Sequence, residues 1–192
     1  MVSGPSGVGK SSVVDGVLER TGSAFSVSAT TRSPRPGEVE GVDYLFVSEE
    51  GFDELIADGS LLEWAEYGKN RYGTPRRPVL YRLASGQDVV LDIENRGAHQ
   101  VKATHPEAVL VFILPPTMEE LERRLRLRGD TADTDIEERL SIAADQITDA
   151  EARFDHVVVN DDLETAISQV VSILQSPNPT GERLSAPGNT EE

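Results

Sequence analysis

Short apolar runs alternate with helical periodicity along most of this chain. The strongest runs, residues 88–93 and 109–114, are blocks of mainly branched apolar residues, as in buried parallel strands. Weaker strand patterns occupy residues 25–28, 44–47, 61–67 and 156–160. Apolar residues spaced along one helix face predict helices at 11–18, 49–58, 76–84, 118–128, 136–152 and 163–174. This order of elements predicts an α/β fold with a parallel central sheet.

The pattern changes character along the chain. Residues 1–29 and 81–175 alternate strand and helix and predict the core, whereas residues 30–80 combine short strands with turns, as in a small α+β insertion. Residues 129–135 predict a polar loop between two helices. The last stretch, 176–192, is rich in Pro, Gly, Asn and Glu without periodicity and predicts a disordered tail.

Composition narrows the classes of protein. The chain has 192 residues, no cysteine and a net charge of −16, which fits one domain without disulfides or thiolate metal sites. This charge argues against a nucleic-acid partner. The sequence has no signal peptide and no apolar run long enough for a membrane, so we expect a cytoplasmic protein. It carries no signal for oligomeric state.

A phosphate-binding motif lies near the start of the chain. Residues 4–11 match Gly, four residues, Gly-Lys and then Ser. The glycines allow a turn whose backbone N–H groups converge on one anion, Lys10 adds positive charge, and the Ser11 hydroxyl suits Mg²⁺. The predicted phosphate-binding residues are Gly4, Pro5, Ser6, Gly7, Val8, Gly9, Lys10, Ser11 and Ser12. The motif therefore predicts a site for a Mg-nucleoside triphosphate.

The strand before this motif is unusually short. A P-loop normally follows a buried strand of about five residues, but only three residues precede Gly4. We therefore expect a weakened first strand: either the strand is short or the start of the chain is trimmed.

Six separated blocks share an order with a known family. They are the P-loop at 4–11 and the segments 28–38, 41–46, 62–65, 72–74 and 159–163. Together they closely resemble guanylate kinase from residue 2 to about 175. The resemblance implies a three-layer P-loop NTPase fold with a GMP-binding insertion at 30–80 and a helical lid at about 124–140. It also implies Mg²⁺-dependent transfer of the γ-phosphate of ATP to GMP, and to dGMP, in purine nucleotide metabolism.

The resemblance assigns the GMP phosphate to Arg32, Arg35, Tyr44 and Tyr72. The residue types agree with this role, because two arginines three positions apart on a Pro-stiffened loop can converge on one phosphate with forked hydrogen bonds. The alternative is that they are surface arginines on a solvated loop.

Guanine recognition falls to three further residues by the same resemblance. Glu63 is the carboxylate that meets guanine N1–H and N2–H₂, with Ser28 and Thr74 as hydroxyl partners. Adenine would place an acceptor opposite that carboxylate, so the arrangement selects for guanine. Taken alone, Glu63 is only a polar residue on an alternating strand, and Trp64 beside it is expected to pack rather than to stack on the base.

A carboxylate at the end of a buried apolar run needs a polar partner, and Asp92 follows such a run. The family has a metal- and substrate-linked aspartate here, so Asp92 is predicted to bind Mg²⁺ together with Ser11 and to take part in the GMP site. The family commonly has a second aspartate two residues later, where this chain has Glu94.

The resemblance also places transition-state charges and an adenine contact. Lys10 and the lid arginines Arg124, Arg128 and Arg139 are predicted to be catalytic, since phosphoryl transfer depends on positioning and charge neutralisation. Asn160 is predicted to contact the adenine side of ATP. The alternative for the arginines is helix surface charge paired with nearby glutamates. Asp130 in the lid motif and Arg71 before Tyr72 depart from the family pattern, and neither has an assigned role.

Two other functions compete with nucleotide phosphorylation. Guanylate-kinase-like modules in scaffolding proteins bind phosphopeptides, but they tend to have degraded P-loops, whereas Lys10 and Ser11 are present here. A related kinase acting on a phosphorylated sugar would lack the guanine-reading residues, which are also present. We therefore expect an ATP:GMP phosphotransferase.

Overall fold

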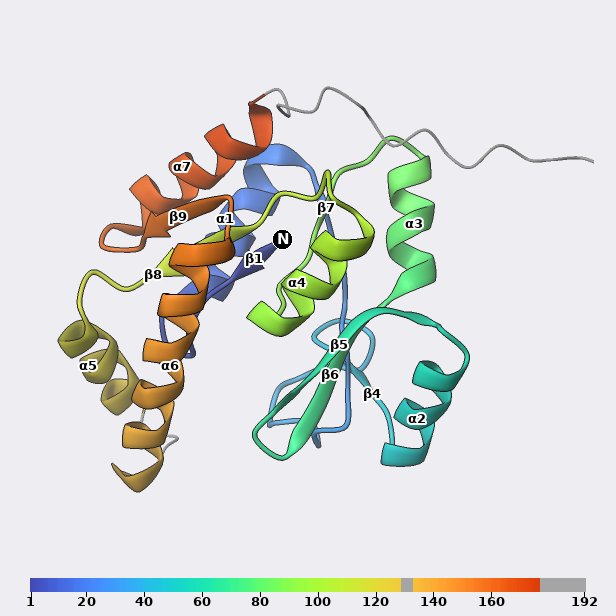
Figure 1. Ribbon diagram of the computed structural model, residues 1–192, viewed down its shortest axis with the longest axis horizontal. Coiled ribbons are helices and arrows are strands. Elements are labelled where there is room, and N and C mark those ends of the chain that lie inside the picture. Colours follow the sequence, from blue (N-terminus) through green and yellow to red (C-terminus); the bar gives the residue numbers. More distant parts are fainter. Residues whose placement is uncertain (129–132, 177–192) are drawn as a thin grey trace, which may run out of the picture. The chain divides into compact units, whose positions relative to one another are not determined.

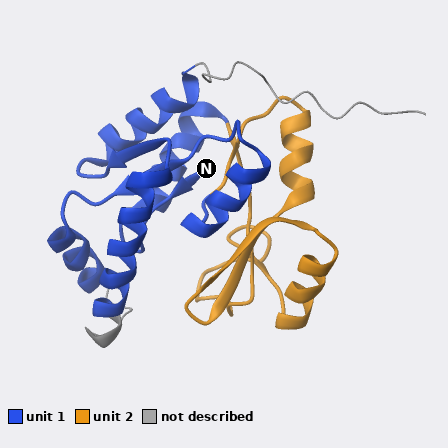
Figure 2. Ribbon diagram, in the orientation of Figure 1, with its two compact units in different colours: residues 1–22, 92–176 blue, residues 23–91, 177–192 orange. Residues whose placement is uncertain are grey.

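A computed structural model describes residues 1–128 and 133–176 of the chain. It divides into two compact units (Figure 2). Unit 1 combines Met1–Gly22 with Asp92–Ser176, and unit 2 is Ser23–Leu91. Each is described here by itself.

Unit 1 is a parallel sheet with helices packed on it (Figure 1). Its elements are β1 (Val2–Ser3), α1 (Lys10–Thr21), α4 (Asn95–Thr104), β8 (Val111–Leu114), α5 (Met118–Arg128), α6 (Asp133–Arg153), β9 (His156–Val159) and α7 (Leu163–Gln175). The strand order is β1-β8-β9, with Val2 opposite Val111 and Val111 opposite His156. Val2 also forms a parallel bridge with Asp92.

The core of unit 1 follows from its apolar pattern. Residues 111–113 of β8 are buried, as expected for a strand covered on both faces. Helices α1 and α7 lie side by side and bury one apolar stripe each, residues 13, 14 and 17 on α1 and 166, 167 and 170 on α7. Asp162 caps α7 by accepting the Thr165 N–H at 2.9 Å, so the helix begins where the sequence places a capping residue.

Unit 2 has two sheets and two helices. Its elements are β2 (Ala24–Phe25), β3 (Ala29–Thr30), β4 (Leu45–Phe46), α2 (Glu49–Ala57), β5 (Leu61–Tyr67), β6 (Asn70–Pro75), α3 (Arg76–Ala84) and β7 (Val89–Val90). Strands β2 and β7 pair in parallel. The other sheet has the order β4-β3-β6-β5, in which β3 and β4 are parallel and the remaining pairs antiparallel.

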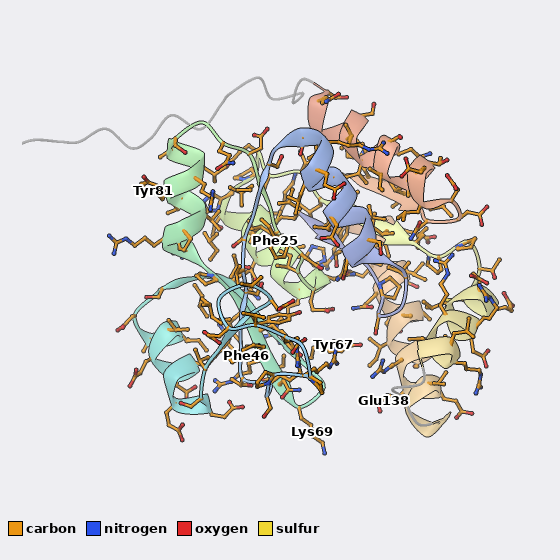
Figure 3. The ribbon with its side chains drawn as sticks, turned by 180° about the vertical axis from the view of Figure 1, so that it is seen from behind. Phe25, Phe46, Tyr67, Lys69, Tyr81 and Glu138 are labelled. Carbon is orange, nitrogen blue, oxygen red and sulfur yellow. The ribbon has the colours of Figure 1, made fainter. Side chains whose placement is uncertain are left out.

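Helix α2 supplies the core of unit 2. Its Phe52 is fully buried against Ala29 and Leu61, and the ring of Trp64 meets Phe52 edge-on at 6.5 Å. Trp64 is therefore a packing residue, as predicted. The partly buried Leu55 and Ile56 pack on the same cluster, so the predicted apolar face of this helix is confirmed. Tyr67 and Lys69 lie at the turn of the β5–β6 hairpin, away from this cluster (Figure 3).

Several predicted elements match the structure. The strand at 61–67 and the helices at 76–84 and 118–128 have the predicted bounds. The first strand is short, with two residues, as expected. The remaining predicted helices and the strands near 44–47, 88–93, 109–114 and 156–160 are present with shifted ends.

Other predictions were wrong. The strand at 25–28 is replaced by two shorter ones, Ala24–Phe25 and Ala29–Thr30, which pair in different sheets. The sequence pattern missed β6 and α4 entirely. The polar loop at 129–135 is too long, because α6 already begins at Asp133; its residues 129–132 lie outside the described residues, as does the predicted disordered tail from 177. Within the described chain, no helix combines the length and apolar character needed to cross a membrane.

Candidate active site

The P-loop connects β1 to the first turn of α1. Gly9 is the N-cap of α1 in the left-handed region, with φ of 91°. A Cβ atom on Gly9 would lie 2.6 Å from Nδ2 of Asn160, so the position has no room for a side chain. The helix begins at Lys10, and its N-terminus supplies backbone N–H groups and a positive dipole end, the features that bind phosphate.

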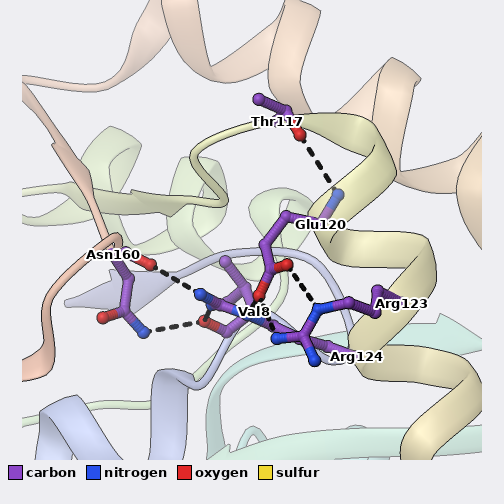
Figure 4. A network of polar contacts seen from close by, with 6 residues as sticks. All are labelled: Val8, Thr117, Glu120, Arg123, Arg124 and Asn160. Atoms are coloured by element: carbon purple, nitrogen blue, oxygen red, sulfur yellow. Dashed lines mark hydrogen bonds and ion pairs between the residues drawn. The ribbon is translucent and has the colours of Figure 1, made fainter.

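A set of hydrogen bonds holds this loop from outside (Figure 4). The Val8 carbonyl accepts from Asn160 Nδ2 at 2.8 Å and from Arg124 Nη1 at 3.1 Å. Arg124 Nη2 donates to the Asn160 carbonyl at 3.1 Å, and its Nε donates to Glu120 at 2.8 Å. Hydrogen bonds from Arg123 and Arg124 lower the pKa of Glu120 to about 2. Arg124 is thus brought to the P-loop, and the surface-pair alternative describes Arg123 better.

Asn160 was predicted to contact adenine. Its side chain is buried, with 5% of its surface exposed, and its amide group donates to the loop backbone. The structure therefore gives Asn160 a part in shaping the P-loop, and a contact with the nucleotide stays a prediction.

Lys10 and Asp92 meet although they are far apart in sequence. Their Nζ and Oδ1 atoms are 2.8 Å apart, and the side chains are only 16% and 23% exposed. The bridge between Val2 and Asp92 explains the contact, because it places Asp92 beside the strand that leads into the P-loop. Two residues predicted to act on phosphate and metal therefore share one side of unit 1.

Glu94 lies in the same region. Burial raises the pKa of its carboxyl group, the charge of Lys10 opposes this, and the charge of Asp92 adds to it. Gln146 on α6 donates to Glu94 at 2.7 Å. Gln146 therefore holds the longer side chain of Glu94 in place from α6. The sequence did not indicate this contact.

A buried asparagine beside Glu94 links three elements and was missed by sequence reasoning. Asn95 accepts from the Ser3 hydroxyl at 2.8 Å and donates to the Gln146 carbonyl and to Asp149, each at 2.9 Å. Its carboxamide thus ties α4 and α6 to the strand that carries the P-loop. Only the position of Asn95 after the Asp92–Glu94 pair could have indicated this.

The oxygen donors near Lys10 suit a magnesium ion. Magnesium in nucleotide sites is bound by one or two protein oxygens together with substrate phosphates and waters. The Asp92 carboxylate and the Ser11 hydroxyl, on the first turn of α1, are donors of this kind. Among residues 1–128 and 133–176 there is no cluster of three His, Cys, Asp or Glu side chains that could hold a metal by itself. The donor set therefore fits Mg²⁺ carried by a nucleotide.

The structure defines the other two arginines predicted for the lid less well. Arg128 is the last residue of α5, and its side chain lies outside the described part of the chain. Arg139 is half-buried on α6. Asp130 also lies outside the described residues. The catalytic roles of Arg128 and Arg139 stay predictions.

The residues predicted to read the base lie next to one another on β5, on β6 and just before β3 of unit 2. Glu63 on β5 stands opposite Thr74 on β6, and the Thr74 hydroxyl donates to Glu63 Oε1 at 2.6 Å. Ser28 directly precedes β3, whose Ala29 pairs with Gly73, so the same register sets Ser28 opposite Thr74. All three are buried, with Glu63 only 4% exposed. A buried carboxylate with hydroxyl neighbours can recognise adjacent N–H donors.

Three of the four predicted phosphate residues come together. The Arg32 guanidinium lies 5.2 Å from the centre of the Tyr44 ring, and Tyr44 and Tyr72 are 6.0 Å apart in an edge contact. Hydrogen bonds with Glu38, and a further one with Tyr72, raise the pKa of Arg32. Arg35 is exposed, and in the described chain its side chain makes no hydrogen bond with the other three. These arginines are therefore not equivalent, and Arg32 is not a solvated surface residue.

Arg71 now has a structural role. Its guanidinium pairs with Glu49 and with Asp53, at 2.6 Å for the latter, and lies 4.8 Å from the centre of the Phe52 ring. It therefore fastens α2 to β6 beside Tyr72, in place of the aromatic residue expected there.

These features define the class of protein first. A glycine-rich loop between a parallel strand and a helix, with a lysine and an aspartate beside it, is the nucleotide site of a P-loop α/β protein.

Comparisons with known proteins then identify the family. A family model described as guanylate kinase matches residues 1–177. The guanylate kinase of Gloeobacter violaceus is 54% identical over 175 residues, which covers 91% of this chain and 85% of that protein. That of Thermus thermophilus is 51% identical over 174 residues, covering 91% of this chain and 79% of the relative. The chain belongs to the guanylate kinase family.

A solved structure supports the same assignment. The crystal structure of guanylate kinase from Anaplasma phagocytophilum matches with a TM-score of 0.77 and 37% sequence identity, covering 93% of this chain and 84% of that one. The α/β P-loop fold predicted from the sequence is therefore confirmed.

Proposed function

We propose that the protein transfers the γ-phosphate of ATP to GMP or dGMP, giving ADP and the guanosine diphosphate, as part of cytoplasmic purine nucleotide metabolism. ATP binds to the P-loop of unit 1, and the monophosphate binds to the four-stranded sheet of unit 2. Family membership supports the reaction type. The buried pair of Glu63 and Thr74 is the observation that carries the choice of guanine.

The base contacts follow from hydrogen-bond chemistry. The Thr74 hydroxyl already donates to Glu63, so it orients the carboxylate toward N1–H and N2–H₂ of guanine. Ser28 then serves as the hydroxyl that donates to O6. Adenine presents the opposite pattern and would leave these buried groups unpaired. The proposed contacts reach the base and the phosphate but not the ribose 2′-hydroxyl, so dGMP should be accepted as well.

Charge placement accounts for the transfer. Lys10 approaches the β- and γ-phosphates, while Arg124, Arg128 and Arg139 neutralise the charge that develops on the transferred group. Arg32, Arg35, Tyr44 and Tyr72 hold the phosphate of GMP so that one oxygen attacks the γ-phosphorus in line. When bound, Mg²⁺ on Ser11 and Asp92 adds charge neutralisation on the ATP phosphates. The step needs no covalent intermediate with the protein.

A substrate panel tests the proposal. ADP formation from ATP is measured with GMP, dGMP, IMP, AMP and ribose bisphosphate under the same conditions. We expect GMP and dGMP to be the good acceptors, IMP to be weaker because it lacks N2–H₂, and AMP to be roughly 10³-fold or more below GMP in kcat/KM. Equal turnover of AMP, a preference for the sugar phosphate, or binding of GMP without turnover would contradict it.

A further inference from the structure

The loop that carries Arg32 and Arg35 closes on itself through a tight turn. Glu38 N–H donates to the Arg35 carbonyl at 3.1 Å, and Gly37 between them has φ of 92°. Pro36 followed by glycine in the left-handed region is the sequence of a type II turn, in which only glycine fits the third position without strain. The turn sends the chain back and returns Glu38 to Arg32.

The Glu38 carboxylate is engaged on both oxygens. Oε1 accepts from Arg32 Nη2 at 2.8 Å, and Oε2 accepts from Arg32 Nη1 at 2.9 Å and from the main-chain N–H of Arg35 at 2.6 Å. The side chains of Arg32 and Glu38 are only 13% and 17% exposed, although the loop around them is largely exposed. The hydrogen bond with Arg32 is the main cause that lowers the pKa of Glu38, so this group stays charged at neutral pH.

A count of the Arg32 donors shows which part of the guanidinium is committed. The group has five N–H bonds. Nη1 uses its two on Glu38 and on the Ser33 carbonyl at 2.8 Å, and Nη2 uses one on Glu38. The other Nη2 hydrogen and Nε–H lie along the second edge of the plane, and a hydrogen bond between Arg32 and Tyr72 adds to the raised pKa of this arginine. One edge of Arg32 is thus fixed by Glu38, and the other, which shares a hydrogen bond with Tyr72, is the edge left for an oxyanion that Arg32 and Tyr72 would contact together.

We propose that Glu38 is a positioning residue for the monophosphate substrate. It holds the Nη1–Nη2 edge of Arg32 and the N–H of Arg35, and thereby directs the Nε–Nη2 edge of Arg32 toward the phosphate. This inference rests on the proposed function of unit 2. The rings of Tyr44 and Phe46 lie 5.2 and 5.8 Å from the guanidinium and limit its rotation further.

The competing view is that Glu38 occupies the place of the phosphate and must leave. That exchange would break three hydrogen bonds to Glu38, including one from the backbone. It is also unnecessary, because Arg32 retains a second edge. A further consequence is that Arg32 and Glu38 together carry no net charge, so the excess positive charge for the phosphate comes from Arg35.

Three variants test this proposal in the full chain. Glu38→Gln keeps the shape of the side chain but removes its charge and one acceptor. Glu38→Asp keeps the charge on a shorter side chain. Glu40→Gln is the matched control, since it lies in the same loop and changes the charge equally, and the Glu40 carboxylate accepts the Phe46 N–H at 2.9 Å rather than a bond from Arg32 or Arg35. KM for GMP and for ATP is measured for each variant, with calorimetric binding of GMP and of guanosine.

The expected pattern is specific to the phosphate. Glu38→Gln should raise the KM and Kd for GMP by roughly 10-fold or more, because charge-assisted hydrogen bonds are the strong ones. Guanosine binding and the KM for ATP should not change, Glu38→Asp should recover part of the loss, and Glu40→Gln should resemble the wild type.

Other outcomes overturn the proposal. Tighter GMP binding by Glu38→Gln would show that Glu38 competes with the phosphate, and unchanged GMP binding would show that it only closes the loop. Equal losses for GMP and guanosine would point to a general structural defect. A wild-type protein without GMP turnover would overturn the proposed function as well, whereas normal wild-type turnover with an unaltered Glu38→Gln variant would overturn only the role of Glu38.

Discussion

The two proposed nucleotide sites are built by opposite means. In unit 1 the phosphate-binding loop is a continuous stretch of main chain, and side chains such as Asn160 hold it from outside. In unit 2 the proposed monophosphate site consists of side chains from several strands and one loop, with Glu63, Thr74 and Arg32 at its centre. A backbone site recognises phosphate of any nucleotide, whereas a side-chain site can distinguish one base from another.

This difference predicts separate effects on the two substrates. Changes in unit 1 should alter turnover and ATP binding, and changes in unit 2 should alter GMP binding. Each variant below is therefore measured against both substrates.

The largest effect is expected for Lys10→Ala. It removes the charge that approaches the β- and γ-phosphates and leaves Asp92 without its partner at 2.8 Å. We expect kcat to fall by roughly 10³-fold or more, as for loss of a main transition-state contact. Calorimetric GMP binding should be unchanged, and Lys10→Arg should recover little because a planar guanidinium does not replace the compact ammonium group of lysine. Turnover near the wild-type rate would contradict the P-loop assignment.

Glu63→Gln should act on the other substrate. Glutamine can still accept from the Thr74 hydroxyl, so the sheet should fold, but one acceptor for guanine becomes a donor. We expect the KM for GMP to rise on the order of 100-fold while the KM for ATP stays the same. Steady-state kinetics with each substrate varied in turn would show this. A similar rise in the KM for GMP and in the KM for ATP would contradict the separate roles of the two units.

Asn95→Leu is expected to affect stability. The change leaves the buried Ser3 hydroxyl and Asp149 without an amide partner, which costs about 1–3 kcal/mol for an unsatisfied buried group. Urea unfolding should show the loss, and the double variant with Ser3→Ala should be less destabilised than the sum of the single changes. GMP binding to unit 2 should be unaltered, and a loss of GMP affinity equal to the loss of stability would contradict the separation.

The smallest effect concerns acid pH. Burial raises the pKa of Asp149, but hydrogen bonds from His99 and Asn95 outweigh it, and the net shift is downward. Its carboxylate therefore stabilises the fold above the unfolded-state pKa, and this contribution is lost as pH falls through the lowered value. Its neighbours His99 and Arg153 also favour the ionised form of the Asp149 carboxylate.

The stability difference between wild type and Asp149→Asn, measured in urea, should therefore shrink as the pH falls below about 4. Asp145→Asn, an exposed position on the same helix, is the control. A difference that grows as the pH falls below about 4 would show the opposite sign and would refute the account.

The sequence revealed the P-loop because its chemistry lies in consecutive residues, and the helix at 118–128 because its apolar spacing is regular. Strand β6 escaped prediction since it contains Gly73 and ends at Pro75, residues that disfavour strands; pairing with β3 on one side and β5 on the other overrides that preference. Helix α4 escaped because its buried face is made of Asn95, Gly97 and Ala98 with a single large apolar residue, Val101, so it shows no clear apolar stripe.

In the candidate site, too, the sequence indicated the local features but not the long-range contacts. The Pro36–Gly37 turn could be read, but its effect on Glu38 could not, because that depends on where the carboxylate arrives in space. The contact of Lys10 with Asp92 depends on the bridge between Val2 and Asp92, which no local pattern indicates. Local signals therefore named most candidate residues, and long-range pairing decided their partners.

The hydrogen bonds from Asn160 and Arg124 to the Val8 carbonyl have a consequence for how ATP binds. The P-loop is tethered there and also through β1, so contacts within the protein restrain its backbone. A restrained loop loses little conformational entropy when the triphosphate arrives, and more of the contact energy remains as affinity. Slow amide exchange in the unliganded loop would be the direct signature of this advance ordering.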